Sequence, residues 1–308
     1  MEQQKKLAKN FNRKNSFFII GLFFLGFIIA LYPISAQVYN IYLQHQDITT
    51  FEKKRREILP EVVSKRIRLA EVYNESLIGG DQLNVSDPFV ALQKEARNEY
   101  ARMLKVEEMI GSISIPTINV ELPIYAGTSE DILQRGAGHL EGSSLPVGGK
   151  STRAVITAHR GLPQARLFTE LDKLKKNDVF YITNIKETLA YKVESIKVIE
   201  PNEVSALSIQ KGRDLVTLLT CTPYMINSHR LLVTGHRIAY NDKVAKQKRA
   251  KATANLLLKI MIILLVVFIL LYLVYRYFRK KLDFKKSKIK GVSITEGDKS
   301  VKEIKFIW

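Results

Sequence analysis

Residues 215–221 read LVTLLTC, an apolar run that closes on Cys221, the only cysteine among 308 residues. Leucine, valine and threonine in such a run favour a buried β-strand. A thiol at the end of a strand is held rigidly where a loop begins, which is a suitable place for a nucleophile. The alternative is that Cys221 is a small buried apolar residue, the commoner role of a lone cysteine. With one cysteine, no disulfide can form within the chain.

A thiol becomes a good nucleophile near neutral pH when a base or a cation lies beside it. His159 is a candidate base, because it follows a strand-like run at 154–158 (AVITA) and opens a loop. Arg230 begins the next apolar run after Cys221, so the connection between the two runs can bring it back alongside the thiol, where it would stabilise an oxyanion. Arg237 is an alternative cation by the same reasoning.

The other histidines have structural interpretations. We interpret His139 as a loop histidine that makes a structural hydrogen bond. His229 and His236 alternate with apolar residues, so we interpret them as surface or barrel-rim groups. His45 lies too close to the first apolar segment to be favoured.

Residues 109–240 predict a β-rich domain. Strand-like runs separated by glycine, proline and asparagine occur at 113–122, 154–157, 179–183, 189–199, 215–220 and 231–238. Many short strands at regular spacing indicate a closed barrel or a sandwich.

Residues 45–108 predict helices instead. Residues 52–73 carry apolar side chains at helical spacing among charges, and residues 88–104 continue in the same style. Glycine and polar residues at 79–87 separate the two helices.

Two long apolar segments, at 17–34 and 260–275, flank this region, and the second reaches back to Leu256 if Lys259 extends toward the membrane surface. Each approaches the roughly 20 residues that span a bilayer as a helix. The net charge of +18 is concentrated beside them, since residues 1–16 carry +4, residues 243–259 carry +6 and residues 276–308 carry +7. This pattern indicates attraction to anionic lipid and argues against a nucleic-acid-binding surface on the folded domain.

The basic residues before the first apolar segment place the N-terminus in the cytoplasm, and a second span returns the C-terminus to that side. We expect an uncleaved anchor rather than a signal peptide, because the cleavage-site pattern is poor. The middle of the chain then lies outside the cell, where the basic linker is suited to lipid headgroups or an anionic wall polymer. The expected order is a basic N-terminus (1–16), a transmembrane helix (17–38), a helical segment (45–108), the β-domain (109–240), a basic linker (241–255), a second transmembrane helix (256–275) and a basic tail (276–308).

Residues 217–221, TLLTC, resemble the TLxTC signature of sortases, the transpeptidases of Gram-positive cell surfaces. Residues 157–160, TAHR, resemble the segment that carries the catalytic histidine of that family, and Arg230 falls where its catalytic arginine belongs. The resemblance covers roughly residues 45–240. It implies a mostly β fold, the eight-stranded sortase β-barrel, with Cys221, His159 and Arg230 as catalytic residues.

The chain resembles class C, the pilin-polymerising sortases, in three features. These are the second apolar segment, the extended helical segment before the barrel, and the sequence DPF at 87–89. DPF is similar to the lid motif of that class, which implies that Asp87 pairs with Arg230 and that Phe89 covers Cys221. The structural alternative is a helix start, with Asp87 as the N-cap and Pro88 at the first helical position.

The resemblance implies that Cys221 attacks the Thr–Gly bond of an LPxTG-like sorting signal and that His159 protonates the leaving amine. The thioester would then pass to a lysine amine of another pilin, with no cofactor and no metal. Two alternatives stay open: a housekeeping-type sortase with a cell-wall precursor as acceptor, and an anchored domain that binds a peptide without cleaving it. The expected partners are pilin subunits with LPxTG-like signals, membrane lipid and anionic wall polymers, but not nucleic acid.

Overall fold

The computed structural model describes residues 2–78 and 100–248, together with some of the residues between 250 and 279. The chain divides into two units, Met1–Ala252 and Thr253–Trp308. The described residues of the second unit are helical. Across the parts of the chain that the structure describes, none of the helices has both the length and the apolar character needed to cross a membrane.

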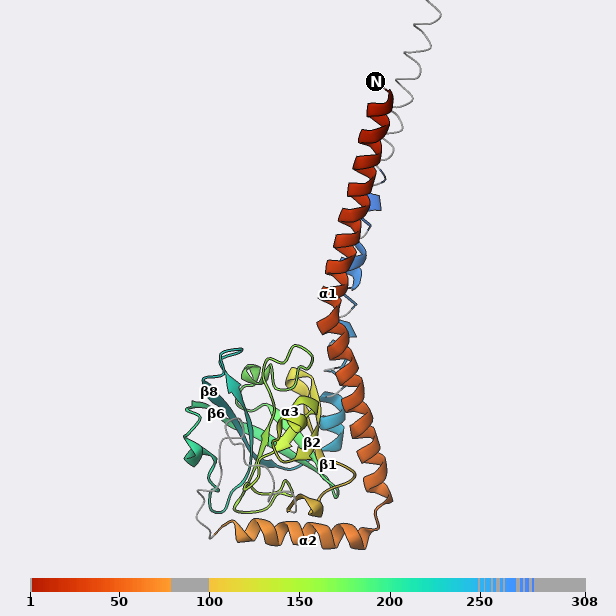
Figure 1. The fold of residues 1–308 in the computed structure, drawn as a ribbon. Helices are drawn as coiled ribbons and strands as arrows, with labels where there is room; N and C mark the ends of the chain where they lie inside the picture. Colours follow the sequence, from red (N-terminus) through yellow and green to blue (C-terminus); the bar gives the residue numbers. More distant parts are fainter. Residues whose placement is uncertain are drawn as a thin grey trace, which may run out of the picture. The chain divides into compact units, whose positions relative to one another are not determined.

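The first unit contains a closed barrel with the strand order β1-β2-β3-β4-β7-β8-β6-β5, in which β5 returns to pair with β1 (Figure 1). The pairs β2/β3 and β4/β7 are parallel, and the other pairs are antiparallel. The eight-stranded barrel that the resemblance implied is therefore confirmed, and of the barrel and the sandwich that the strand pattern allowed, the barrel is the one formed. The strands are β1 (Met109–Ile115), β2 (Val120–Ala126), β3 (Ala137–His139), β4 (Thr152–Thr157), β5 (Val179–Thr183), β6 (Thr188–Ile199), β7 (Asp214–Thr222) and β8 (His229–Ile238).

Two details of the strands differ from the prediction. The run 113–122 is interrupted by the 3-10 helix η3 (Pro116–Ile118), because Pro116 lacks the backbone N–H that a strand needs and Asn119 turns the chain with a left-handed φ of 51°. Strand β3 was not predicted, since its three residues, AGH, are too short and too glycine-rich to show a pattern. His139 therefore lies in a strand, and its placement in a loop was wrong.

Strands β4 and β7 are buried on both faces over most of their length, which explains why aliphatic residues and threonine make up most of their sequences. Ala154, Ile156 and Leu218 belong to the main core of the unit. Their sequence neighbours Val155 and Leu219 point the other way. They form a second apolar cluster with Leu140, Ile199, Leu207 and Leu232, beside the 3-10 helix η5 (Val204–Leu207).

Most of the described residues before β1 are helical, with α1 (Glu2–Glu57), α2 (Pro60–Ser76) and the 3-10 helix η2 (Tyr100–Met103). A single helix over 52–73 was wrong. The helix is interrupted before Pro60, because proline forces the preceding Leu59 into an extended conformation with ψ 137°. Of the predicted helix at 88–104, the described end forms η2, and the rest lies outside the described residues. Two short helices complete the barrel connections, α3 (Glu130–Arg135) and η4 (Leu171–Lys173).

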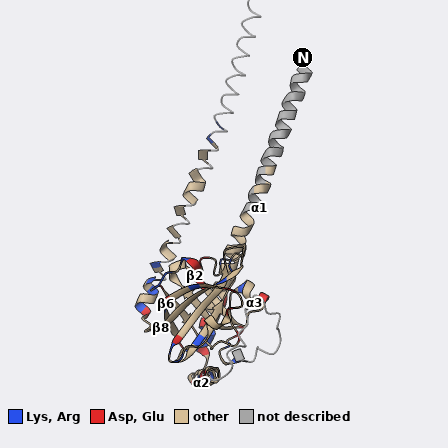
Figure 2. Cartoon of the chain, turned by 90° about the vertical axis from the view of Figure 1, so that its left-hand side faces the viewer, with Lys and Arg blue, Asp and Glu red and all other residues tan. Residues whose placement is uncertain are grey.

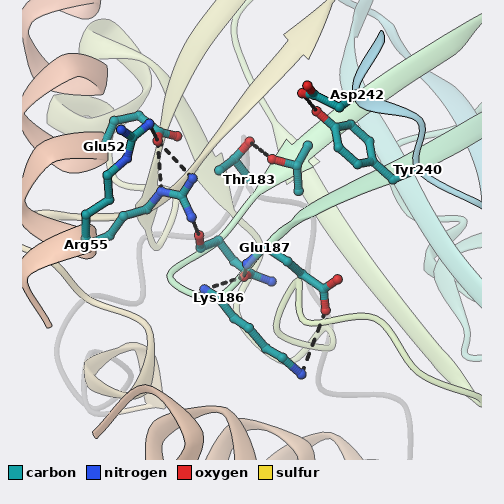
Figure 3. A network of polar contacts seen from close by, with 10 residues as sticks. Glu52, Arg55, Thr183, Lys186, Glu187, Tyr240 and Asp242 are labelled. Atoms are coloured by element: carbon teal, nitrogen blue, oxygen red, sulfur yellow. Dashed lines mark hydrogen bonds and ion pairs between the residues drawn. The ribbon is translucent and has the colours of Figure 1, made fainter. Parts of the chain in front are cut away.

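Helix α1 docks on the barrel through its last turns. Ile48 and Phe51 are buried in the main core. Arg55 is held by Glu52 on the same helix and donates to the Asn184 carbonyl at the turn between β5 and β6, 3.4 Å away (Figure 3). At the same end of the barrel, where Asn184 Nδ2 donates to the carbonyl of Pro146, the buried side chain of Asn74 from α2 donates to the carbonyl of Leu145 and accepts from its N–H. The two helices thus belong to the folded unit.

Replacing Phe51 by alanine tests this docking. The side chain is 1% exposed, so its removal leaves a cavity between α1 and the barrel. We expect the free energy of unfolding to fall by about 3–5 kcal/mol, as for other buried aromatic truncations. Val72→Ala on α2 is the control, because Val72 is 47% exposed and should change stability by less than about 0.5 kcal/mol. Urea unfolding of both variants measures the difference, and equal effects would contradict the docking of α1.

Candidate active site

Cys221 and Arg230 are direct neighbours across two antiparallel strands. Cys221 lies near the end of β7, Arg230 near the start of β8, and their Cα atoms are register partners. Opposite residues in such a pair have side chains on the same face of the sheet. Both side chains are buried, at 6% and 5% exposure. The structure therefore brings together the thiol and the cation that the sequence singled out.

Arg230 also organises the loop that follows the nucleophile. Its Nη1 donates to the backbone carbonyls of Asn227, at 3.0 Å, and His229, at 3.1 Å. Inside the loop, the N–H groups of Ile226 and Asn227 both donate to the carbonyl of Pro223. The guanidinium is thus fixed in place by the backbone of residues 227–229, as a preorganised hydrogen-bond donor must be.

His159 reaches the same region along β4. This strand runs parallel to β7, with Thr157 opposite Leu219. The pairing continues past the end of β4, since the Ala158 N–H donates to the Leu219 carbonyl and Thr220 Oγ1 donates to the Ala158 carbonyl at 2.7 Å. Continuing both strands by two residues from the pair Thr157 and Leu219 brings the backbone of His159 level with that of Cys221. The predicted neighbourhood of thiol and imidazole at two strand ends follows from this register.

The alternation of side chains shows which face of the barrel carries the site. Cys221 lies two residues after Leu219, and Arg230 lies two residues before Leu232. Both leucines belong to the second apolar cluster, so the thiol and the guanidinium lie on its face of the sheet rather than in the barrel interior. The nucleophile therefore belongs to the outer face of the barrel wall, where it is buried.

Two further residues of the site were not singled out from the sequence. Both carboxylate oxygens of Glu130, at the start of α3, lie 3.2 Å from Nε2 of His159. Arg160 donates from Nη1 to Thr222 Oγ1 at 2.8 Å and forms an ion pair with Asp172, also at 2.8 Å. Glu130 is 29 residues from His159 in a short surface helix, so no sequence pattern marks it. Arg160 could have been noticed in the sequence, because it belongs to the segment TAHR. In the structure it ties the loop after His159 to the residue after Cys221.

The alternative residues lie elsewhere. Arg237 is at the far end of β8, where its guanidinium lies 5.7 Å from the centre of the Tyr191 ring and 3.9 Å from Asp214. His236 is half-buried against Glu194, and His229 pairs with Glu200 at the surface. His45 is exposed on α1.

His139 is fully buried, and it makes the structural hydrogen bond that the sequence suggested. Its Nε2 lies 2.8 Å from the carbonyl of Ser144. Because a carbonyl can only accept, this nitrogen carries the proton. Burial lowers the pKa of His139 to about 4, so the imidazole is neutral at physiological pH.

The lid motif Asp87-Pro88-Phe89 lies outside the described residues, so its pairing with Arg230 and Cys221 stays a prediction. Within the described residues, no group of three or more histidine, cysteine, aspartate or glutamate side chains is arranged to hold a metal ion. The site as described is a buried thiol opposite Arg230 on the next strand, with His159 just past the end of the parallel strand β4. These groups suit acyl transfer through a covalent thioester, with the cation at the oxyanion.

A β-barrel with such a site defines a cysteine acyltransferase, and comparisons with known proteins agree. A family model described as a sortase domain matches residues 113–238. Sortase C-1 from Streptococcus pneumoniae is 54% identical, with a TM-score of 0.61, and the match covers 64% of this chain and 100% of that one. A pilus-related sortase C of Group B Streptococcus is 52% identical, with a TM-score of 0.59, covering 62% of this chain and 97% of that one. Sortase A of Bacillus anthracis is 29% identical over 140 residues, which are 46% of this chain and 65% of that relative.

The chain belongs to the sortase family, whose members are cysteine transpeptidases. The resemblance of the chain to sortases is thus confirmed by identity over nearly the whole length of two solved sortases. Both of these solved structures are sortases C.

The assignment of the cation can be tested with two matched substitutions. Arg230→Lys replaces a planar fork of donors by a point charge beside Cys221, so we expect the rate of acyl-enzyme formation to fall by roughly 10²–10³-fold. Arg237→Lys, at the far end of the same strand, should leave that rate within about twofold. Mass spectrometry of the acyl-enzyme over time gives both rates, and the reverse ranking would show that Arg237 is the functional cation.

The buried His139 should make stability depend on pH. Its pKa is about 4 in the folded protein and about 6.5 when unfolded, so between these values only the unfolded chain takes up the proton. Stability is therefore retained above pH 6.5 and falls toward pH 4, by on the order of 3 kcal/mol at 1.36 kcal/mol per pKa unit. His139→Gln should remove this slope while leaving acyl-enzyme formation at pH 7.5 nearly unchanged. Parallel stability curves for the two proteins, from urea unfolding at several pH values, would contradict the argument.

Proposed function

We propose that this sortase joins pilin subunits into a polymer, by cleaving an LPxTG-like sorting signal on one pilin and transferring it to a lysine amine of the next. The observation that carries the proposal is the identity of more than half of the aligned residues with sortases C, one of them described as pilus-related, over nearly their full length. The neighbouring positions of Cys221, His159 and Arg230 supply the chemistry.

In the first half-reaction, Sγ of Cys221 attacks the carbonyl carbon of the threonine in the sorting signal. The N–H groups of Arg230 stabilise the oxyanion as it forms, and His159 gives a proton to the amine of the leaving glycine. The C–N bond breaks, and the thioester is left on the enzyme.

In the second half-reaction, a lysine amine of another pilin attacks the thioester. His159 accepts a proton from this amine, the C–S bond breaks, and Cys221 is regenerated as an isopeptide bond forms. One amide bond is exchanged for another, so neither an energy source nor a metal enters the balance.

A housekeeping-type sortase, with a cell-wall precursor as acceptor, is the second candidate. The same first half-reaction serves both functions, and only the acceptor differs. The pilin acceptor is favoured because identity is 52–54% with the sortases C but 29% with sortase A of Bacillus anthracis. The third interpretation, a domain that binds a peptide without cleaving it, leaves the association of a thiol, an imidazole and a guanidinium unexplained.

The proposal includes an extracytoplasmic site on a chain anchored at both ends, with both termini in the cytoplasm. Residues 15–46 contain no Asp, Glu, Lys or Arg, and Figure 2 shows the described stretch of α1 before the barrel without charged residues. Figure 2 also shows acidic and basic residues interspersed over the barrel, so the excess positive charge lies in the flanking segments. Those segments suit contact with anionic lipid and wall polymers.

Cys221→Ala tests the nucleophile. We expect the variant to fold normally but to form no acyl-enzyme and no polymer, because no other thiol is present. The measurement is an incubation with a pilin that carries an LPxTG-like signal, followed by mass spectrometry of the enzyme and a search for ladders that survive boiling in detergent.

The wild-type protein separates the candidate functions in the same incubation. Ladders with pilin alone support the polymerase. An acyl-enzyme that is discharged by a wall-precursor amine, but not by pilin, supports the housekeeping type. Ladders with the Cys221→Ala protein would contradict the mechanism altogether.

A further inference from the structure

Glu130 is held in one position although its side chain is 61% exposed. Its Oε1 accepts a hydrogen bond from Nε2 of Gln134, one helical turn later, at 3.0 Å. Both of its oxygens face Nε2 of His159 at 3.2 Å. The imidazole itself is largely covered, with 18% of its side chain exposed. A carboxylate restrained from both sides thus faces the ring nitrogen of the proposed acid–base residue.

Helix α3, which carries Glu130, is fixed to the body of the unit. Leu133 is buried at 1% exposure, and the buried side chain of Gln44 on α1 donates to the carbonyl of Arg135 at 2.9 Å. Arg135 in turn bonds Glu108 at 2.7 Å. A six-residue helix would be marginal alone, so these contacts are what give the carboxylate a defined position.

Helix α1 also holds the loop that begins at His159. Gln37 Nε2 donates to the carbonyl of Pro163 at 2.9 Å, and Asn40 Nδ2 donates to the carbonyl of Gln164 at 2.8 Å. One helix therefore braces both sides of the contact between Glu130 and His159. The contact is built into the fold rather than left to two mobile surface side chains.

We propose that Glu130 is a positioning residue that fixes the orientation and tautomer of His159. An ionised carboxylate can only accept hydrogen bonds, so the proton of the neutral imidazole stays on Nε2. Nδ1 is then the nitrogen that gives and takes the catalytic proton. When His159 is an imidazolium, before it gives its proton to the leaving amine and again after it takes one from the lysine amine, the carboxylate stabilises its charge, as a third group does in other nucleophile–base pairs. The inference rests on the acid–base role of His159 in the proposed function.

A kinetic comparison in the full-length protein tests the role in catalysis. Glu130→Gln keeps the size and an oxygen acceptor but removes the charge, and we expect kcat for a quenched LPxTG peptide to fall about threefold to tenfold with little change in KM, as suits an exposed ion pair. Glu130→Ala should lower kcat further. The matched control is Asp131→Asn, which removes the same charge from the next, exposed residue of α3 and should stay within about twofold.

Two kinetic outcomes would overturn the proposal. If Glu130→Gln and Glu130→Ala both keep the wild-type kcat, the contact has no catalytic role. If Asp131→Asn loses as much activity as Glu130→Gln, the effect is one of general charge and not of position. Melting temperatures of the three variants, expected to be close to that of the wild type, separate both cases from a folding defect.

A spectroscopic measurement needs no substrate, and so distinguishes failure of this inference from failure of the proposed function. Nitrogen-15 NMR of histidine-labelled protein reports which ring nitrogen carries the proton, and the His159 signals are assigned by their loss in His159→Gln. We expect the Nε2–H tautomer in the wild type and in Asp131→Asn, and a mixture of tautomers in Glu130→Ala. A wild-type Nδ1–H tautomer, or no change in Glu130→Ala, would refute the proposal.

Discussion

The pairing of β7 with two partners of opposite direction is the constraint on which the site depends. Its parallel partner β4 delivers His159 to the level of Cys221, and its antiparallel partner β8 begins with Arg230 opposite the thiol. A shift of either register by one residue would turn His159 or Arg230 to the other face of the sheet. The chemistry therefore needs no special loop to bring its groups together, because the hydrogen-bond ladder of three neighbouring strands does so.

The burial of β7 on both faces protects this register. Leu218 packs into the barrel core, while Leu219 packs into the second apolar cluster on the outer face. Slipping the strand would place the wrong side chains on each side and would lose both sets of contacts. The outer cluster thus has two effects, since it stabilises the strand and provides an apolar surface beside the nucleophile.

Much of this arrangement could be predicted from the sequence, because each strand around Cys221 has a strong local pattern. The runs 154–157 and 215–220 consist of aliphatic residues and threonine without a charge, as suits buried parallel strands, and the motif around the lone cysteine marked the chemistry. His159 and Arg230 followed from their positions at the ends of such runs. The distinction between Arg230 and Arg237 could not be made by pattern alone, since both lie in β8 and only the pairing with β7 shows which end adjoins the thiol.

Other features depend on contacts distant in sequence, and no local pattern reveals them. Glu130 is an ordinary surface acid until the fold brings His159 to it from 29 residues away. Strand β3 exists because Ala137 and His139 pair with β2, although three residues give no periodicity. The end of the helix before Pro60, by contrast, could have been predicted locally from the proline, and the prediction of a single helix over 52–73 overlooked it.

The continuity of α1 has a mechanical consequence. An α-helix is a stiff spacer that advances about 1.5 Å per residue, whereas a loop of the same length would not hold the barrel at a fixed distance from the start of the helix. With the anchor proposed above, the stretch from the bilayer to the end of α1 would set the height of the thiol over the lipid surface. The amide side chains of Gln37, Asn40 and Gln44 lie on that spacer and grip the loop and helix around His159. The active site would therefore stay at a fixed height above the membrane, and both the tail of one substrate and the amine of the next would have to reach it there.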